Sequence, residues 1–364
     1  MNSGESYLKN RMFTLKKIIN KFQFYFQSFL NFFRLGKIFL ISDKNNWVIK
    51  TIVKEINKNT SIKTSISSSP LFLKNKIIHF GSIHDFIFHK EKVHPSNKII
   101  ASWYHINGRN IEKGLAKEIR EKNIPIHTSC SITKKGLINL GIKEKQIKVI
   151  PLGIDLKIFK PLKNPLEKTE IKKRLGLPLD KIIIGSFQKD GNGWKEGNEP
   201  KLIKGPDIFC DTIEILAKKY PLHILLTGPA RGYVKNRLSE AGIPFTHKYL
   251  KKYNNIVNFY HALDLYIISS RVEGGPMALL ESWATSIPLI STPVGMVKDL
   301  ARPEENILLS SSFSPEEFAS LASYLINNSE LSSKISKNAL KDIQNYSWQK
   351  MAESYFQKLY LPFQ

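Results

Sequence analysis

The sequence has little cysteine, few acidic residues and no long uninterrupted apolar run. Its 364 residues include only two cysteines, Cys130 and Cys210. They are too few for a disulfide framework or a zinc spacing, and they are compatible with a reducing cytosol. The apolar N-terminal stretch is interrupted by lysine and asparagine and has no small-residue cleavage site, so no signal peptide is evident.

Several binding patterns are absent as well. Neither G-x-G-x-x-G nor G-x-x-x-x-G-K-[ST] occurs, which excludes the usual dinucleotide and P-loop signatures. Asp-x-Asp, a frequent metal-binding pair, does not occur either. The histidines at 79, 84, 89 and 94 do not align on one helix face, and no cysteine or carboxylate pattern accompanies them. We therefore expect no metal site and no cofactor.

The scarcity of acidic residues is uneven along the chain. The net charge is +24, and residues 1–180, with 34 basic and 13 acidic residues, contribute 21 of these charges. Such a charge makes nucleic-acid binding one interpretation, but no basic motif with interleaved aromatic residues occurs after the N-terminal segment, so we expect no nucleic-acid partner. The asymmetry favours a basic N-terminal domain that faces an anionic surface, either a membrane or an acidic glycan.

Residues 1–36 form a segment of their own. No acidic residue occurs between Glu5 and Asp43, and apolar residues recur at steps of four and three. They are Leu8, Met12, Leu15, Ile19, Phe22, Phe26, Phe29 and Phe33. This pattern predicts a basic amphipathic helix in the interface of an anionic membrane, interrupted by too many polar residues to span it. A helix packed on the protein's own core, or a coiled-coil seam, is the alternative.

From residue 37 to 150 the pattern is that of alternating strands and helices. Apolar runs suited to buried strands occur at 37–42, 77–80, 98–104, 124–128 and 148–150. This alternation predicts a doubly wound parallel sheet. Because ligands bind at the carboxyl ends of such strands, we expect a crevice formed by Asp43, His79, His105 and residues 129–131.

A second α/β domain is predicted over residues 151–345. Prolines cluster around a short connector after residue 150, and strands are expected at 181–187, 223–228, 262–270 and 288–292. Two such domains must close on a substrate, so the connector should be a hinge over a cleft. Residues 346–364 contain a terminal helix that begins near Trp348.

The strand at 262–270 leads into a tight turn and a helix. Gly274 and Gly275 permit a sharp turn and close approach of a ligand to the backbone. Pro276 suits the first position of the helix Met277–Thr285. A helix N-terminus at the carboxyl end of a parallel strand is a favourable place for an anion, which the amides of Gly274, Gly275 and Met277 could bind.

Two carboxylates flank this turn. Glu273 lies in the loop and Glu281 lies in the helix, with seven residues between them. A carboxylate accepts two hydroxyl hydrogen bonds, so each suits a vicinal diol, one of a ribose and the other of a hexose. The alternative is a glycine turn with one solvated glutamate and one capping glutamate.

Lysines in the long loop of residues 188–205 are candidate phosphate ligands. They are Lys189, Lys195, Lys201 and Lys204, and the last precedes Gly205 and the helix that begins near Ile208.

The segment Glu273–Glu281, E-G-G-P-M-A-L-L-E, followed by S-W-A-T-S-I-P-L-I-S-T-P-V-G, resembles the Glu-x7-Glu motif of family 4 retaining glycosyltransferases (glycosyl transferases group 1). The resemblance implies a GT-B fold, in which two doubly wound Rossmann-like domains face a central cleft. The connector V-I-P-L-G-I-D is similar to the interdomain linker of that family. A terminal helix such as 346–364 crosses back to the first domain in GT-B proteins.

The resemblance also implies a role for each candidate residue. Glu273 would hold the sugar hydroxyls and Glu281 the ribose, while Lys204 would bind the diphosphate. The family's diphosphate-binding arginine is missing, and Lys189 is the proposed substitute. His105 would orient the sugar or the acceptor.

Three departures from the family pattern are visible. Ser286 stands where glycine is usual, and Ser186 stands nearest to the missing arginine. The loop after the first strand has no glycine.

These features predict a retaining glycosyltransferase of the hexosyl type, which uses a nucleoside diphosphate sugar and a hydroxyl acceptor. The acceptor is expected to be an envelope polysaccharide or lipid-linked glycan, and the location cytoplasmic, peripheral at the membrane. The resemblance also implies that the leaving phosphate takes the acceptor proton, so that no general base is needed. A sugar-nucleotide epimerase of GT-B fold and a non-catalytic membrane or RNA adaptor on the same frame are the alternatives.

Overall fold

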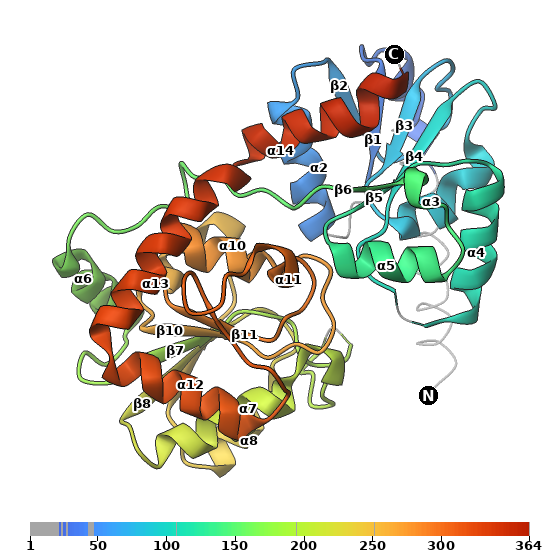
Figure 1. Ribbon diagram of the computed structural model, residues 1–364. Coiled ribbons are helices and arrows are strands. Elements are labelled where there is room, and N and C mark those ends of the chain that lie inside the picture. The colour runs from blue at the N-terminus through green and yellow to red at the C-terminus, as the bar shows by residue number, and fades with distance from the viewer. Residues whose placement is uncertain are drawn as a thin grey trace, which may run out of the picture. The chain divides into compact units, whose positions relative to one another are not determined.

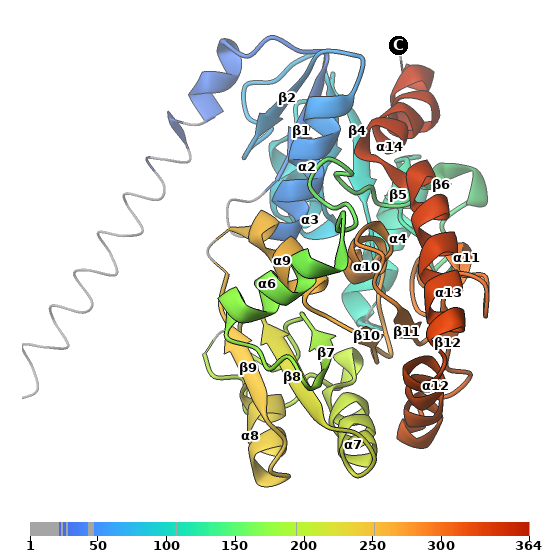
Figure 2. The ribbon, with the colours of Figure 1, turned by 90° about the vertical axis from the view of Figure 1, so that its left-hand side faces the viewer.

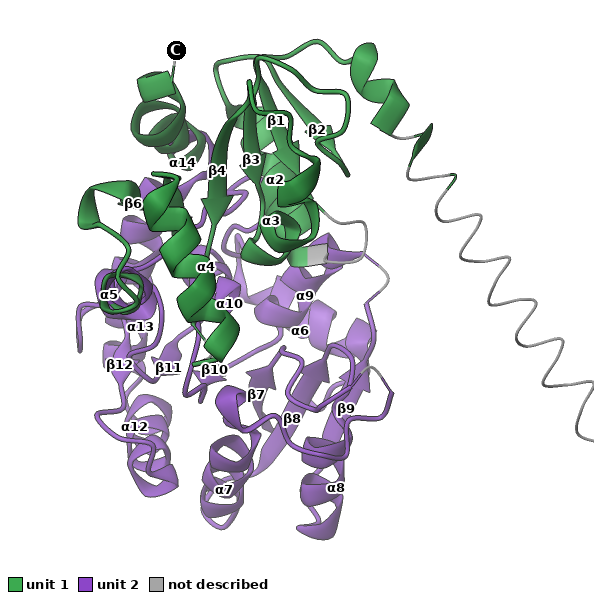
Figure 3. Ribbon diagram, turned by 90° about the vertical axis from the view of Figure 1, so that its right-hand side faces the viewer, with its two compact units in different colours: residues 1–128, 136–150, 351–364 green, residues 129–135, 151–350 purple. Residues whose placement is uncertain are grey.

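The computed structural model describes residues 22, 25–26, 28–42, 47–106, 108–193, 195–250 and 252–363. Most of the helix predicted before residue 34 lies outside these residues, as does Asp43. The chain divides into two compact units (Figure 3). One comprises residues 1–128, 136–150 and 351–364, and the other comprises residues 129–135 and 151–350.

The first unit is built on a parallel six-stranded sheet. Its strands are β1 (Ile38–Ile41), β2 (Thr64–Ser67), β3 (Ile77–Phe80), β4 (Lys98–Ser102), β5 (Ile126–Thr128) and β6 (Ile147–Val149), in the order β2-β1-β3-β4-β5-β6. All five pairings between neighbours are parallel. The order in which successive strands are added to the sheet reverses between β1 and β3, as in flavodoxin-like sheets.

Helices connect these strands and pack on the sheet (Figure 1). They are α2 (Trp47–Asn59), α3 (Ile83–His89), α4 (Asn110–Glu121) and α5 (Ser131–Asn139), and α5 is shared by the two units. The core is aromatic and β-branched, with Phe39, Phe80, Phe86, Trp103 and Ile126 buried. The strands β1 and β3 are buried along their whole length, which is why each appears in the sequence as a continuous apolar run.

The C-terminal segment belongs to the first unit. Helix α14 (Trp348–Tyr355) continues as a π-helical turn over Phe356–Tyr360. The Tyr360 hydroxyl lies 2.7 Å from Nδ1 of His79, and the Tyr355 hydroxyl lies 3.0 Å from Nε2 of His127. The Ser102 hydroxyl lies between the two rings, 3.0 Å from Nε2 of His79 and 2.9 Å from Nδ1 of His127. A buried polar network thus fastens the end of the chain to β3, β4 and β5.

The second unit has the strand order of dinucleotide-binding domains. Its strands are β7 (Ile182–Ser186), β8 (Leu222–Thr227), β9 (Phe245–Lys248), β10 (Leu265–Ile268), β11 (Leu289–Ser291) and β12 (Leu308–Leu309). All pairings are parallel and the order is β9-β8-β7-β10-β11-β12. Numbered from the first strand of the unit this is 3-2-1-4-5-6, so the winding reverses between β7 and β10.

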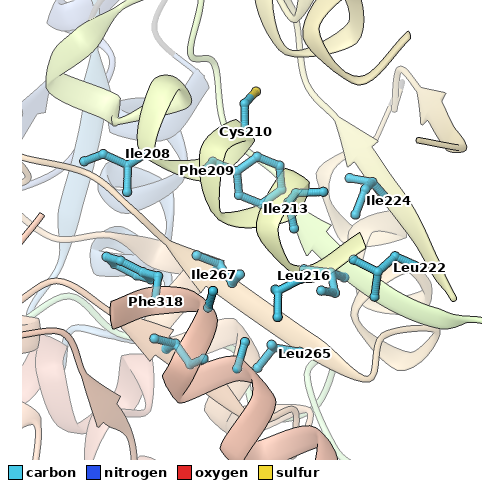
Figure 4. Close-up of a cluster of buried hydrophobic side chains, with 14 of the residues drawn as sticks. Ile208, Phe209, Cys210, Ile213, Leu216, Leu222, Ile224, Leu265, Ile267 and Phe318 are labelled. Carbon is cyan, nitrogen blue, oxygen red and sulfur yellow. The ribbon is translucent and has the colours of Figure 1, made fainter. Parts of the chain in front are cut away.

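Helices cover both faces of this sheet (Figure 1). They are α6 (Pro165–Leu175), α7 (Pro206–Ala217), α8 (Gly232–Glu240), α9 (Ile256–His261), α10 (Met277–Ala284), α11 (Val297–Leu300), α12 (Pro315–Asn327) and α13 (Ser329–Asp342). Figure 4 shows the apolar face of α7 against β8, β10 and α12, with Phe209, Ile213, Leu216, Ile267 and Phe318 in one buried cluster. No helix within the described residues has the length and apolarity needed to cross a bilayer.

Candidate active site

The residues predicted to bind the sugar nucleotide lie near the carboxyl ends of β7 and β10, where the winding of the second sheet reverses. The loop of residues 187–205 follows β7, and the loop of residues 269–276 follows β10. In open α/β sheets a crevice forms at this point because the two connections leave toward opposite faces. The sheet topology therefore places the lysine-rich loop and the glutamate turn beside each other.

Gly205 fixes the contact between the two loops. It has φ +61°, and its carbonyl accepts a 2.7 Å hydrogen bond from the Ser269 hydroxyl. A Cβ atom built on Gly205 would lie 1.9 Å from the backbone oxygen of Ser269. Only glycine satisfies both the left-handed backbone and this approach. Lys204, the preceding residue, is thereby held against the end of β10.

Lys204 and Glu273 form an ion pair at this junction. Lys204 Nζ lies 2.6 Å from Glu273 Oε1, and their side chains are 24% and 13% exposed. The Ser270 hydroxyl donates a second, 2.9 Å hydrogen bond to the same carboxylate oxygen. Lys204 and Glu273 were predicted from separate sequence motifs and lie 69 positions apart in the chain, yet their side chains are in direct contact.

Further lysines reinforce the positive charge. The pKa of Lys201 is lowered, first by burial and then by the charges of Lys204 and Lys189. Glu273 opposes this shift. The charges of Lys189 and Lys204 therefore both act on Lys201, although the three lysines lie on different turns of the loop. Lys195 lies elsewhere, where it lines a cavity beside Glu196 and Arg231 at the end of β8.

The glycine turn presents backbone donors. The Gly274 carbonyl accepts a 2.9 Å bond from the Met296 amide, which ties the turn to the loop after β11. A Cβ atom on Gly275 would lie 2.9 Å from Leu152 Cδ1, so the turn is closely packed on that side. Within the described part of the chain, the amide groups of Gly274, Gly275 and Met277 donate no hydrogen bond. They are the unsatisfied donors that an anion would use.

Helix α10 begins at Met277, as predicted, but Pro276 does not take the first helical position. Pro276 has φ −66° and ψ 111° and is the N-cap, so the first helical position belongs to Met277. The reason is that the backbone of Pro276 is still in the extended conformation, so helical geometry begins only at the next residue. The Met277 amide is consequently the first of the helix and remains a candidate donor.

Glu281 is buried rather than open to the loop. It is 3% exposed, its Oε2 accepts a 2.6 Å bond from Tyr260, and its Oε1 accepts a bond from Tyr253. Burial raises the pKa of Glu281, and the two tyrosine hydroxyls partly offset that shift. Sequence reasoning missed this pair of tyrosines. Their separation of seven residues, two helical turns, was the only signal that both face one side.

A second feature that sequence reasoning missed is a buried arginine beside Ser186. Arg231, from the loop after β8, is 1% exposed and donates to the carbonyls of Ser186 (2.7 Å), Gln188 (2.8 Å) and Thr227 (3.0 Å). Its Nε lies 3.0 Å from Asp190 Oδ1. Burial raises the pKa of Asp190 to about 6, although the Arg231 charge opposes that shift. This buried pair anchors the start of the loop that carries Lys189.

The two histidines that were predicted to line a crevice in the first unit, His79 and His105, differ from each other in their surroundings. His105 is exposed and borders a cavity of about 110 Å³ together with Trp103, Tyr104 and Arg109. Its proposed orientation toward a sugar stays a prediction. The expectation that His79 lines a crevice is wrong, because His79 is 2% exposed and both ring nitrogens are bonded within the core.

The segment after β5 is grouped with the second unit. The Ser131 amide donates a 2.7 Å bond to Asp299 of α11, and the Ser131 hydroxyl binds the same carboxylate. Ser129 Oγ would lie 3.2 Å from a Cβ atom on Gly275. Residues 129–131 therefore border the glycine turn. Among the described residues, no cluster of three or more His, Cys, Asp or Glu side chains is arranged to hold a metal ion.

Residues 200–342 match the family model described as glycosyl transferases group 1. The lipopolysaccharide core biosynthesis mannosyltransferase LpsB of Rhizobium meliloti is 33% identical over 160 residues, 42% of each chain. A D-inositol 3-phosphate glycosyltransferase of Corynebacterium urealyticum is 24% identical over 57% of this chain and 49% of its own. The aligned part thus spans about half or less of these relatives.

Solved structures agree over more of the chain. Anabaena HepE, solved in complex with UDP-glucose, is 14% identical with a TM-score of 0.71, and the match covers 88% of this chain and 98% of HepE. A glycosyltransferase from Rickettsia africae is 17% identical with a TM-score of 0.65, covering 92% and 93%. At these identities the likeness concerns the fold.

Two parallel α/β units of this topology define the GT-B class, so the predicted fold class is confirmed. Residues 200–342, which match the glycosyl transferases group 1 family model, contain Lys204, Glu273 and Glu281. The resemblance to glycosyl transferases group 1 that was predicted from the Glu-x7-Glu segment is therefore confirmed for these residues.

Proposed function

We propose that the protein is a retaining glycosyltransferase that moves a hexosyl group from a nucleoside diphosphate sugar to a hydroxyl acceptor. The observation that carries the proposal is the Lys204–Glu273 pair beside the open amides of the glycine turn. A cation for a phosphate, a carboxylate for sugar hydroxyls and free helix-terminal donors occur together within a family segment whose relatives are glycosyltransferases.

The chemistry follows from where charge develops. As the bond to the sugar breaks, the nucleoside diphosphate gains negative charge, which fixed cations and oriented amides stabilise. Lys204 would supply the nearest cation, with Lys189 and Lys201 adding to the field. The amides of Gly274, Gly275 and Met277 would bind the phosphate oxygens. We propose that the leaving phosphate takes the acceptor proton, so that no general base and no metal ion is required.

In the free protein Lys204 and Glu273 bind each other, so donor binding requires an exchange of partners. Lys204 would turn to the diphosphate and Glu273 to the sugar hydroxyls. Ser270 remains bonded to Glu273 Oε1 and keeps that carboxylate in place during the exchange. The pair therefore keeps both groups positioned and partly desolvated before the donor arrives.

The ribose would bind at Glu281. Each of its carboxylate oxygens has one lone pair left after accepting from Tyr253 and Tyr260. Tyr253 belongs to a short exposed turn (Tyr253–Asn255) and is the less buried of the two tyrosines, so its displacement would open the path to Oε1.

The names of relatives narrow the substrate class. LpsB is named for lipopolysaccharide core synthesis, and TuaC of Bacillus subtilis, 29% identical over 44% of this chain, for teichuronic acid synthesis. An envelope polysaccharide or a lipid-linked glycan is accordingly the proposed acceptor. The basic N-terminal half would place the protein peripherally at the cytoplasmic face of the membrane.

A thermal-shift screen of uridine, guanosine and adenosine diphosphate sugars tests the donor site. A donor at about 100 times its Kd stabilises the native state by about 2.7 kcal/mol, a shift of several degrees. Lys204→Met and Glu273→Gln should each abolish that shift and the transfer activity. Lys195→Met removes the same charge from the same loop, away from the Glu273 site, and should preserve both. A Lys204→Met protein that keeps full activity would refute the site.

Glu281 needs a conservative variant. Glu281→Ala would orphan two buried tyrosine hydroxyls, at a cost of about 1–3 kcal/mol each, and would mix misfolding with lost binding. Glu281→Gln keeps the side-chain volume and one acceptor oxygen. It should bind the donor at least ten-fold more weakly while remaining folded.

The two alternative functions give different results in the same samples. An epimerase would convert the sugar nucleotide without an acceptor, which NMR of the donor alone detects. A non-catalytic adaptor would bind no sugar nucleotide, which calorimetry detects.

A further inference from the structure

The residues before β1 carry an unusual group of exposed aromatic side chains. Phe29, Phe32, Phe33 and Leu35 are 50%, 61%, 69% and 70% exposed. Phe72, from the loop between β2 and β3, is 48% exposed and stacks on Phe32, with ring centroids 5.2 Å apart and an interplanar angle of 29°. We call these five residues the aromatic platform. Exposed apolar groups gathered in this way mark interaction sites.

The platform is fixed to the first unit rather than attached by a free helix. The Asn31 amide group donates 2.9 Å hydrogen bonds to the carbonyls of Ser69 and Leu71. The Ser65 hydroxyl, on edge strand β2, donates a 3.1 Å bond to the Leu35 carbonyl. Asn31 is 4% exposed although its aromatic neighbours are not. Figure 2 shows this short helical segment standing at the start of β1.

Phe72 adopts a backbone conformation that its side chain disfavours. Its φ is +65°, and the Leu73 amide bonds the Pro70 carbonyl at 3.3 Å, so Phe72 occupies the third position of a β-turn. This position of a turn with a left-handed residue favours glycine or asparagine. A large residue held there while half exposed gains little from burial in the protein. The turn instead places an aromatic ring beside Phe32.

The two chain segments that carry the platform have charges of one sign only. Residues 28–42 and 60–84 contain no acidic residue, and they carry Arg34, Lys37, Lys63, Lys74 and Lys76. Lys37, Lys63 and Lys74 are exposed. Exposed aromatic rings on segments whose only charges are basic match the interface of an anionic bilayer, where rings enter the headgroup region and lysines pair with lipid phosphates.

We propose that the aromatic platform is a preformed membrane-docking surface that inserts Phe32 and Phe72 together into an anionic lipid leaflet. This inference deepens the proposed function, since it specifies how the enzyme would reach a lipid-linked acceptor. It differs from docking by an N-terminal helix alone, because Phe72 lies outside that helix and contributes to the same surface.

Vesicle co-sedimentation of the full chain tests the proposal. The vesicles contain 70% phosphatidylcholine and 30% phosphatidylglycerol, with pure phosphatidylcholine as the comparison. Phe72→Asn removes the ring and supplies a residue suited to the turn, so the melting temperature should not fall. Its partitioning should weaken roughly five- to ten-fold, as expected for the loss of one half-exposed phenyl group.

Phe88→Asn is the matched control. Phe88 is 75% exposed on α3 of the same unit, outside the platform, and its substitution should change partitioning less than two-fold. Equal losses in both variants would overturn the proposal, as would a Phe72→Asn protein that binds vesicles like the wild type. A platform that pairs with a second copy would instead appear as a dimer that Phe72→Asn dissociates, with unchanged vesicle binding, and that outcome also overturns it.

The lipid composition separates this proposal from the proposed function. Binding to phosphatidylglycerol vesicles should exceed binding to pure phosphatidylcholine and should weaken with added salt, because the lysines act electrostatically. None of these measurements requires a sugar nucleotide. A chain that docks through Phe72 and yet binds no donor would refute the transferase and leave the docking surface in place.

Discussion

Acidification should destabilise the first unit through two buried histidines. The pKa of His79 is lowered to about 3 by burial and by the neighbouring His127. The pKa of His127 is lowered to about 4 by burial, against the opposing effect of the Ile150 carbonyl. Both rings are bonded to tyrosines of the C-terminal segment, so protonation would place a charge where Tyr355 and Tyr360 dock.

The sign and size of the effect follow from linkage. An unfolded histidine takes up a proton near pH 6.5, whereas these two stay neutral until about pH 4 or below. The unfolded state therefore binds more protons between these values, and stability is lost as the pH falls through 6.5. From pH 7 to pH 5 each histidine costs about 2 kcal/mol, together about 4 kcal/mol. Since both folded values lie well below pH 5, the sum depends little on their exact position.

Hydrogen exchange with mass spectrometry locates the loss. Amides in β3, β5 and residues 351–360 should lose protection at pH 5 relative to pH 7, after correction for intrinsic exchange. A change of about 4 kcal/mol corresponds to a melting point lower by roughly 10 °C for a unit of this size.

The contribution of Asp190 to the stability of the second unit has the opposite sign. Its pKa is about 6, so on acidification the folded state takes up this proton before the unfolded state does.

A variant isolates the cause. His79→Gln removes one titrating ring and should halve the pH dependence of the stability of the first unit, whatever its stability at pH 7. Equal protection at pH 5 and pH 7, or an unchanged slope in His79→Gln, would show that the buried rings are not what titrates.

Two substitutions test the backbone of the second unit. Gly205→Ala should lower the free energy of unfolding by at least about 2 kcal/mol and abolish donor-induced stabilisation, since its Cβ meets the Ser269 carbonyl. Gly176→Ala, at φ +70° in open space, should cost only about 1 kcal/mol in the same urea titration, and equal losses would refute the clash. Ser286, at φ +62°, should accept glycine with a gain of up to about 1 kcal/mol and lose about 1–2 kcal/mol as valine; a fully stable valine variant would contradict a left-handed position.

The parts of the fold that could be predicted from the sequence are those with a strong local signal. The buried strands β1, β3 and β10 appear as apolar runs, and the glycine turn separates strand from helix. The strands that were missed are β2, Thr-Ser-Ile-Ser, β9, Phe-Thr-His-Lys, and the two-residue β12, Leu-Leu. All three lie at a sheet edge with one partner. Strands β2 and β9 are only half buried, so neither needs an apolar sequence, and β12 is too short to give a pattern.

In the candidate site, too, the residues in local sequence motifs could be predicted, whereas contacts between residues far apart in the chain could not. The Glu-x7-Glu spacing indicated Glu273 and Glu281, and the lysine before Gly205 indicated Lys204. Their actual partners could not be predicted, because contacts between residues far apart in the chain leave no local pattern. His79 illustrates the limit: its place near the end of a strand suggested a crevice, but Tyr360, 281 residues away, makes it a core residue.

The net charge of the lysines and Glu273 at the candidate site can be compared with the charge of a sugar nucleotide. Lys189, Lys201 and Lys204 with Glu273 sum to +2, equal and opposite to the two negative charges of a nucleoside diphosphate sugar. On the proposed function, a bound donor would neutralise the site, and the third negative charge would develop on the leaving diphosphate inside it. When no sugar nucleotide is bound, Glu273 would pair with Lys204. The partly buried lysines would then not be left without any carboxylate partner.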